Sequence, residues 1–263
     1  MSRLGQPMTN DNKIIYGVNP VLETIRAAPG KVREILISDA TGRQPLRSIK
    51  LEAERFGLRI VSVSPKILDG LVSHQRHQGV VARIEPYPYL SLETALDELS
   101  VADSGHPVLV LDGLTDPRNF GALLRTAEAV GVQYVIIPKD RAVDVTPVAV
   151  KTSAGAAQHL RIAKVANLRR AIESLKKLGY WITGLDARSR QTIYDVSYPE
   201  KLAIVLGSEG KGIRPVVLGV CDFTLSIPML GRIASLNVAV AGAVFFYEIL
   251  RQRRSGGKES TKS

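Results

Sequence analysis

The chain has 263 residues, of which 45% are hydrophobic, so its length suits one large or two modest folded domains and argues against extensive disorder. Lysine and arginine outnumber the acidic residues by 35 to 25, which gives a formal net charge of +10. A cationic surface attracts polyanions through counterion release, so nucleic acid is the first partner to consider. A single cysteine excludes an intramolecular disulfide framework.

No segment of the sequence is suited to crossing a membrane or to directing secretion. Apolar stretches such as Pro107–Leu111 and Val238–Phe246 are shorter than the roughly 20 residues that span a bilayer as a helix. The first residues, MSRLGQPMTNDN, lack the apolar block of a secretory signal. Together these features predict a cytoplasmic protein.

The front of the chain has the pattern of a small α/β unit. Residues 1–13 are polar and are predicted to form a flexible N-terminus, after which helical and extended patterns alternate over 14–86. Helices are expected at Val18–Ala28 and Leu46–Phe56. The strands predicted from β-branched runs are Val32–Ile37, Leu58–Val63 and Gly79–Ile84.

A stiff segment separates this unit from the rest of the chain. Two prolines in three residues, at Pro86 and Pro88, disfavour a helix, so 87–106 is predicted to contain a linker and then a helix. Apolar strands and helical segments alternate over 107–252, as is typical of a parallel sheet covered on both faces. The basic residues 253–263 are expected to form a disordered tail.

The second unit supplies the candidate sites. Its expected strands are Val108–Asp112, Tyr134–Pro138, Tyr180–Leu185, Leu202–Gly207 and Phe223–Ile227. Helices are expected at Phe120–Val130, at Leu168–Leu178 and from near Ser235 to about Arg251. Apolar residues surround most of the last helix, which is therefore predicted to be buried or to lie at a subunit contact. Ligands collect beyond the carboxyl ends of parallel strands, so the polar segments that follow these strands are the places to search.

The first such segment runs from Asp112 to Gly121 and leads to Arg125. Asn119 is suited to cap the helix that follows, a role that needs no chemistry. The ordinary role of Arg125 would be a surface ion pair with Glu128, which is worth only about 0.3–0.5 kcal/mol. These residues alone favour the structural interpretation.

The second segment, Leu206–Gly212, is a glycine-rich turn directly after a strand. Such a turn can bring backbone donors close to an anion or a nucleotide. It is not a Walker A loop, because Gly212 stands where Ser or Thr should follow the lysine. Glu209 is unusual in this setting because its carboxylate would repel a phosphate. A plain tight turn remains the alternative.

The third segment contains Ile227–Met229, then Gly231, then Ser235–Asn237 at the start of the last helix. Capping by Ser235 and core packing by the methionine are the ordinary explanations. Elsewhere, His74 and His77 have helical ligand spacing, but no further histidine or cysteine nearby completes a zinc site. The sequence therefore predicts no metal.

In this order, the three segments resemble the SpoU (TrmH-type) family of SPOUT methyltransferases. The matching positions are Asn119-x-Gly121-x-x-x-Arg125, Leu206-Gly207-Ser208-Glu209-Gly210-x-Gly212, Ile227-Pro228-Met229 and Ser235-Leu236-Asn237-Val238. The front unit resembles the substrate-binding domain of one branch of that family, through Tyr16-Gly17, Val21-Leu22-Glu23 and His77-Gln78-Gly79-Val80. One departure is Ala239, where relatives often carry a serine.

The resemblance implies an α/β protein whose parallel-sheet methyltransferase domain, 107–252, contains a deep trefoil knot and follows a small RNA substrate-binding domain, 14–86. It implies S-adenosylmethionine as the cofactor, 2′-O-methylation of an RNA ribose, and a homodimer. The residues that it assigns to the cofactor are Gly207, Ile227, Met229 and Leu236. The residues that it assigns to catalysis are Arg125, Asn119, Glu209, Ser235 and Asn237.

The front unit also bears on the choice of RNA. Short tRNA-modifying relatives lack it, whereas the branch that methylates a guanosine of 23S rRNA carries it, so that substrate is favoured. Arg76, His77 and Gln78 are candidates for contact with a structured RNA loop, although a loop that merely joins helix to strand is the alternative. The competing functions are a tRNA ribose 2′-O-methyltransferase, an antibiotic-resistance rRNA methyltransferase, and a non-catalytic knotted RNA-binding protein.

Overall fold

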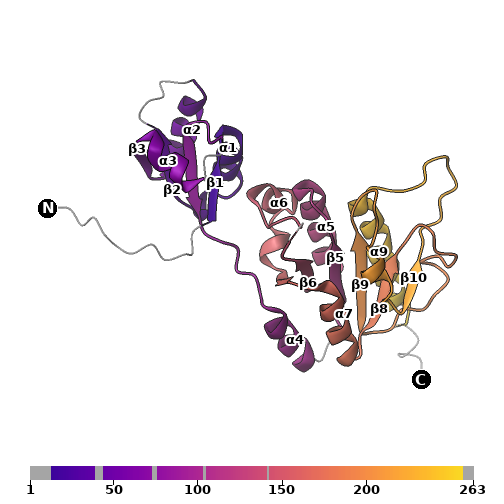
Figure 1. The fold of residues 1–263 in the computed structure, drawn as a ribbon. Coiled ribbons are helices and arrows are strands. Elements are labelled where there is room, and N and C mark those ends of the chain that lie inside the picture. The colour runs from indigo at the N-terminus through magenta and orange to yellow at the C-terminus, as the bar shows by residue number, and fades with distance from the viewer. Residues whose placement is uncertain (1–12, 39–43, 73–75, 103–104, 141, 257–263) are drawn as a thin grey trace. The chain divides into compact units, whose positions relative to one another are not determined.

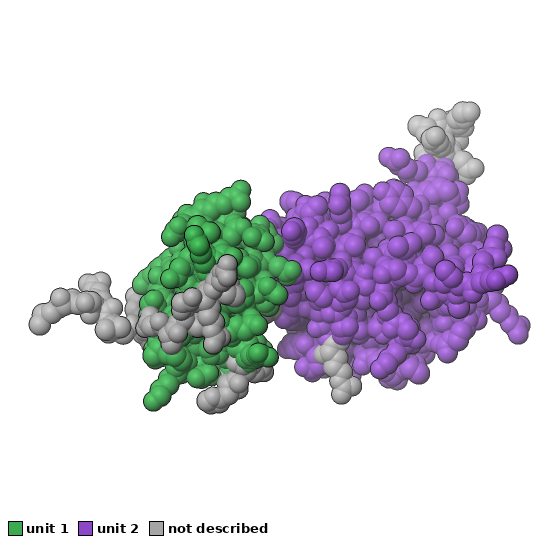
Figure 2. Space-filling view, turned by 90° about the horizontal axis from the view of Figure 1, so that it is seen from above, with its two compact units in different colours: residues 1–88 green, residues 89–263 purple. Residues whose placement is uncertain are grey.

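The computed structural model describes residues 13–38, 44–72, 76–102, 105–140 and 142–256. Contacts between residues divide the chain into two compact units, 1–88 and 89–263, which are coloured separately in Figure 2. Within the described ranges, no helix is both long enough and apolar enough to cross a bilayer. Each unit has its own sheet and its own core, so each is described by itself.

Unit 1 is built on a four-stranded sheet of order β1-β4-β2-β3 (Figure 1). Strand β4 is antiparallel to both of its neighbours, whereas β2 and β3 are parallel. The strands are β1 (Lys13–Tyr16), β2 (Val32–Ser38), β3 (Ile60–Val63) and β4 (Val80–Ile84). The helices are α1 (Val18–Ala27), the short 3-10 helix η1 (Pro29–Lys31), α2 (Gln44–Arg55) and α3 (Pro65–Leu71).

Alternating side chains of these strands supply two cores, one on each face of the sheet. Ile35 and Ile37 of β2 join Val21 and Ile25 of α1 in the larger cluster. Leu36 of β2, which lies between them, packs on the other face with Val81 of β4 and Leu68 of α3. Because successive side chains of a strand point to opposite faces, one sheet can bury both helical layers.

Unit 2 contains a six-stranded, wholly parallel sheet of order β10-β8-β9-β5-β6-β7. The strands are β5 (Val108–Asp112), β6 (Tyr134–Pro138), β7 (Arg161–Val165), β8 (Trp181–Leu185), β9 (Leu202–Gly207) and β10 (Phe223–Leu225). The helices are α4 (Leu92–Val101), α5 (Pro117–Ala129), α6 (Pro147–Thr152), the 3-10 helix η2 (Ala156–Gln158), α7 (Leu168–Lys177), α8 (Pro215–Leu218) and α9 (Val238–Gly256). The sequence did not indicate β7.

Helices cover both faces of this sheet, which explains why its central strands are apolar throughout. One face packs against α4 and α7, whose buried residues include Leu99 and Ile172. On α9, Gly242 lies so close to α5 and β9 that an added Cβ would be 2.3 Å from Leu123 Cδ1 and 3.1 Å from Leu206 Cδ1. The last helix therefore packs directly on the central strand whose end carries the glycine-rich loop.

The last helix differs from the prediction at both ends. It begins at Val238 rather than near Ser235, because the Asn237 side chain accepts hydrogen bonds from the first free backbone N–H groups. It continues to Gly256, so the prediction of a disordered tail is wrong for 253–256. Arg253 anchors this end by donating a 2.6 Å hydrogen bond to the carbonyl of Glu200. Residues 1–12 and 257–263, predicted to be a loose N-terminus and tail, lie outside the described ranges.

Candidate functional site

A cavity of about 580 Å³ lies at the carboxyl ends of β8, β9 and β10. Its walls come from the segment after β8, the glycine-rich loop after β9, and the segment that joins β10 to α9. The lining residues are Leu185, Asp186, Ala187, Arg188, Leu206, Gly207, Ser208, Glu209, Gly210, Lys211, Gly212, Ile227, Met229, Ala234, Ser235, Leu236, Asn237, Val238 and Ala241. All four residues assigned to the cofactor by resemblance are therefore on the wall of one cavity.

Three polar side chains from distant parts of the chain meet at the edge of this cavity. Glu209 Oε1 accepts hydrogen bonds from Asn119 Nδ2 at 2.8 Å and from Asn237 Nδ2 at 2.6 Å. Asn237 Nδ2 also lies 2.9 Å from Asn119 Oδ1, its acceptor. We call Asn119, Glu209 and Asn237 the amide–carboxylate triangle. It joins the start of α5, the loop after β9 and the start of α9.

The helix starts that carry two of these residues differ from the sequence prediction. Asp116, not Asn119, caps α5, since its carboxylate accepts a 2.7 Å hydrogen bond from the Arg118 N–H. Proline at the first helical position fits this start, because Pro117 has no N–H to satisfy. Likewise Asn237 caps α9 in place of Ser235. The caps leave the Asn119 side chain and the Asn237 Nδ2 group available for the triangle.

The loop after β9 folds back tightly over the end of its own strand. The Ser208 and Gly212 backbones exchange hydrogen bonds of 3.1 and 2.9 Å. A Cβ on Gly207 would lie 2.0 Å from the Gly212 carbonyl carbon and 2.2 Å from the Ile213 nitrogen. Position 207 therefore requires glycine for lack of space, whereas Gly210 and Gly212 adopt positive φ angles of 78° and 65°.

The residues that follow β8 form one side of the cavity, although their sequence carries none of the predicted site motifs. Asp186 there accepts hydrogen bonds from the Arg188 backbone at 3.0 Å and from its guanidinium at 3.0 and 2.8 Å. These hydrogen bonds lower the pKa of the Asp186 carboxyl below its ordinary value, so the group is charged at neutral pH. Leu185 ends a strand that the sequence did predict, and its position at a carboxyl end was the available signal.

Of the residues assigned to catalysis, Asn119 and Arg125 are absent from the cavity wall; Asn119 still bonds to the wall residue Glu209, whereas Arg125 does not. It lies on α5 with an exposed side chain and is absent from the cavity wall. The expected ion pair with Glu128 is not formed, and no hydrogen bond joins the Arg125 side chain to another described residue. Its guanidinium is therefore not held by any side chain in the described part of the chain.

The predicted RNA-contact residues of unit 1 have different surroundings. His77 is held by Asp69 at 3.0 Å and by the Gly79 N–H, which donates to its Nδ1 at 3.0 Å. Gln78 has a positive φ of 54°, and its Oε1 accepts the Val18 N–H at the start of α1. Arg76 is exposed. The first two side chains thus organise the loop, and Arg76 is available for contact.

No metal site is present in the described part of the chain, where no group of three or more His, Cys, Asp or Glu side chains could hold an ion. His74 lies outside the described residues. Burial raises the pKa of the Cys221 thiol to about 11, which keeps it protonated at neutral pH and makes it a poor nucleophile.

The fold of unit 2 and its cavity together indicate the class of protein. A parallel α/β sheet with a cavity at its carboxyl edge, partly apolar walls and a few convergent polar groups is typical of enzymes that bind a small organic ligand. The chain belongs to the SpoU rRNA Methylase family, which matches residues 106–247. Residues 14–90 match the RNA 2′-O ribose methyltransferase substrate-binding domain.

Individual relatives match across both units. The 23S rRNA (guanosine-2′-O-)-methyltransferase RlmB of Coxiella burnetii is 40% identical over 92% of this chain and 97% of its own length. The SpoU methyltransferase AviRb from Streptomyces viridochromogenes, solved with the cofactor AdoMet, is 25% identical with a TM-score of 0.60, covering 93% of this chain and 91% of AviRb. The TrmH/SpoU tRNA modifying enzyme of A. aeolicus, at 28% identity and a TM-score of 0.53, covers 64% of this chain and 87% of its own.

Proposed function

We propose that this protein is an S-adenosylmethionine-dependent RNA 2′-O-ribose methyltransferase that acts on a guanosine of 23S rRNA. The observation that carries the proposal is the convergence of three polar segments around one cavity, with the amide–carboxylate triangle at its edge. The RNA target rests on the match of RlmB across both units. Because ribosomal RNA is the proposed substrate, we also place the protein in the cytoplasm.

The cavity fits S-adenosylmethionine in size and in chemistry. Its volume of about 580 Å³ falls within the usual range for sites that enclose a small organic ligand. Ile227, Met229 and Leu236 supply apolar wall for an aromatic ring. At Gly207, the absence of a side chain lets the backbone of the loop approach closely. When bound, the cofactor supplies an electrophilic methyl group on a sulfonium.

The polar residues of the chain prepare the RNA ribose for reaction. The triangle fixes the Glu209 carboxylate between two amides, and Ser235 adds a hydroxyl to the rim. Arg125 clamps the phosphate beside the target ribose and stabilises negative charge that develops on the 2′-oxygen. A guanidinium suits this role better than that of a base, because it keeps its proton in proteins. Alignment of the two reactants supplies much of the remaining rate enhancement.

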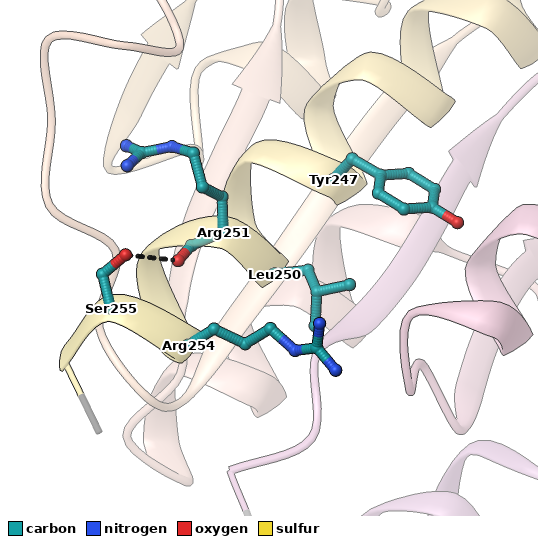
Figure 3. A pocket seen from close by; sticks show the side chains of 5 residues that line it. All are labelled: Tyr247, Leu250, Arg251, Arg254 and Ser255. Carbon is teal, nitrogen blue, oxygen red and sulfur yellow. Dashed lines mark hydrogen bonds between the residues drawn. The ribbon is translucent and has the colours of Figure 1, made fainter. Parts of the chain in front are cut away.

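A second copy of this chain is proposed to complete the site. Among the described residues, none pairs with the Arg125 side chain, which lies off the cavity wall, so it is available to a neighbouring subunit. The outer face of α9 offers an apolar surface, with Val240 49% and Tyr247 55% exposed. A hollow of about 500 Å³ on this helix is lined by Tyr247, Leu250 and Arg254 among others. Figure 3 shows the side chains of these residues. We propose that this face forms a homodimer contact.

The carboxyl-terminal part of the chain is proposed to form a trefoil knot, as in the family that the sequence resembles. In support, the segments that follow β8 and β10 hydrogen-bond to each other beside the cavity, through Gln191, Ile193 and Ser226. A knotted chain pulled from its ends would stop short of its full contour length. Full extension in a single-molecule stretching experiment would disprove the knot.

Unit 1 is proposed to select the RNA. It matches the family's substrate-binding domain, and the A. aeolicus tRNA-modifying enzyme aligns with only 64% of this chain. Arg76, which is exposed and directly precedes His77, is the first candidate for RNA contact. His77 and Gln78 support the loop before β4 from within.

One experiment tests both the reaction and the target. The protein is incubated with methyl-labelled S-adenosylmethionine and with separate pools of unmodified 23S rRNA and tRNA, and the products are mapped by resistance of 2′-O-methylated positions to alkaline cleavage. Label at one guanosine of 23S rRNA is expected. Label in the tRNA pool alone would change the assigned substrate. No calorimetric binding of the cofactor, together with no transfer to either pool, would favour a non-catalytic RNA-binding protein.

A further inference from the structure

A buried carboxylate lies directly behind the glycine-rich loop. Asp112 is the last residue of β5, pairs in register with Gly207 of β9, and is only 1% exposed. Its Oδ2 accepts a 2.8 Å hydrogen bond from the Arg214 backbone N–H, and its Oδ1 accepts one of 2.7 Å from Arg214 Nε. A carboxylate can be buried in this way only if charged or polar partners compensate for lost hydration.

The ion pair between Asp112 and Arg214 lies at the point where the glycine-rich loop ends. Arg214 directly follows Ile213, where the loop has passed back over Gly207 and re-entered the core. The Ser208–Gly212 hydrogen bonds close the neck of the loop, and the Asp112 contact fixes the chain immediately beyond that neck. The loop between carries Glu209, whose carboxylate belongs to the triangle.

We infer that Asp112 and Arg214 are positioning residues, which clamp the base of the 208–212 loop and so hold both the cavity wall and Glu209 in place. Neither residue lines the cavity, so each acts through the loop rather than on a ligand. The clamp uses both oxygens of Asp112, one for the backbone and one for the guanidinium. The inference rests on the proposed function for its catalytic consequence, but the loop geometry can be tested without it.

The test compares Asp112→Asn with a matched change elsewhere in the sheet. In Asp112→Asn, one acceptor becomes an NH₂ group that faces a donor of Arg214, so the clamp loses half of its hydrogen bonding. Asp222 makes the same pair of contacts, with Lys176 Nζ at 2.7 Å and the Ile182 N–H at 2.8 Å, but at the opposite end of β8. Asp222→Asn is therefore the control, and Arg214→Gln, at an exposed position, is a second variant that is expected to fold.

Amide hydrogen exchange is measured by mass spectrometry on the ligand-free, full-length proteins. We expect exchange in 207–214 to become about tenfold faster in Asp112→Asn and Arg214→Gln but not in Asp222→Asn. Exchange in β7, Arg161–Val165, reports any global loss of stability. Unchanged protection of 207–214 in both clamp variants, or an equal increase in β7, would overturn the inference.

Calorimetry then links the clamp to the cavity. The dissociation constant of S-adenosylmethionine is expected to rise about tenfold in the two clamp variants and to stay within twofold in Asp222→Asn. A clamp variant with loosened exchange but normal affinity would show that the loop does not shape the cavity, and would contradict the positioning role. If the unaltered protein binds no S-adenosylmethionine, the proposed function fails, while the exchange data still decide whether the clamp exists.

Discussion

One side chain of the site both caps a helix and bonds to a distant carboxylate, and that side chain is Asn237. Its Oδ1 caps α9 by accepting the Ala239 and Val240 N–H groups at 2.9 and 3.3 Å, while its Nδ2 donates to Glu209. A sequence shows that asparagine is a good cap, but it cannot show that the other half of the amide faces a carboxylate from 28 positions away. Such double use makes a cap and a site residue look alike in sequence.

Asn237→Asp separates the helix cap from the hydrogen bond to Glu209. The new carboxylate keeps the cap and even favours the helix dipole, but it faces Glu209 with a like charge and has no N–H to donate. We expect the methylation rate constant to fall about 100-fold, by analogy with the loss of one well-placed polar group in other enzymes. Rates and thermal midpoints should be measured together with Asn167→Asp, which alters the equivalent cap of α7. Equal activity in the two variants would contradict a role for the triangle.

At the scale of elements, the sequence predicts strands better than the starts of helices. Val108–Asp112 and Tyr134–Pro138 are observed with the predicted bounds, because wholly apolar runs between polar turns have few alternative placements. The start of α5 was placed too late, since the Asp116–Pro117 pair caps it before the apolar pattern begins. Strand β7 was missed because Arg161 and Lys164 interrupt its apolar run.

Gly121 determines how closely α5 approaches α6. A Cβ there would lie 1.8 Å from Thr152 Oγ1 and 2.6 Å from the Ala149 carbonyl oxygen, which belongs to a backbone that cannot easily move. We expect Gly121→Ala to destabilise unit 2 by about 1–3 kcal/mol, although alanine is the better helix former. Gly70→Ala in α3, where nothing lies within 4 Å, should instead stabilise by up to about 1 kcal/mol. Urea unfolding measures both, and a stabilising Gly121→Ala would contradict the close packing.

A second contact between elements connects α9 to the segment after β8. Glu248 is buried and accepts hydrogen bonds from Arg251 and from Gln252, which also donates to the Val196 carbonyl. The Arg251 hydrogen bonds, as the largest cause, lower the pKa of Glu248 below its ordinary value near 4.5. A lowered pKa in the folded state contributes stability above the unfolded value and loses it as the pH falls through the folded one.

The stabilisation of wild type over Glu248→Gln should therefore be full at pH 7 and should shrink below about pH 4.5, where the carboxyl becomes protonated. Thermal midpoints of both proteins, recorded from pH 7 to pH 3, measure the difference. Arg188→Gln serves as a control for a surface ion pair, because its guanidinium is largely exposed. A difference between wild type and Glu248→Gln that stays constant over this range would contradict the assigned ion pair.

At the scale of the whole molecule, the ordered motifs predicted most of the residues that gather at the cavity, but not the position of Arg125. Gly207, Ile227, Met229 and Leu236 line one cavity as the resemblance implied, because carboxyl ends of neighbouring parallel strands meet at one edge. Arg125 does not join them in a single chain. Motifs give the order of residues along the chain but not the distances between them, so the separation of Arg125 from the cavity is evident only in the fold.

Complementation between two inactive variants tests whether Arg125 of a second chain reaches the cavity. If each site takes Arg125 from one chain and Glu209 from the other, co-refolded Arg125→Ala and Glu209→Ala chains form heterodimers with one intact site. Random pairing makes half of the dimers mixed, so roughly a quarter of wild-type methylation should return. Glu209→Ala mixed with Asn237→Ala is the control, because these residues are bonded within one chain and no site can be whole. Failure of the first mixture to exceed the second would place Arg125 in the same site as its own Glu209, or outside the site altogether.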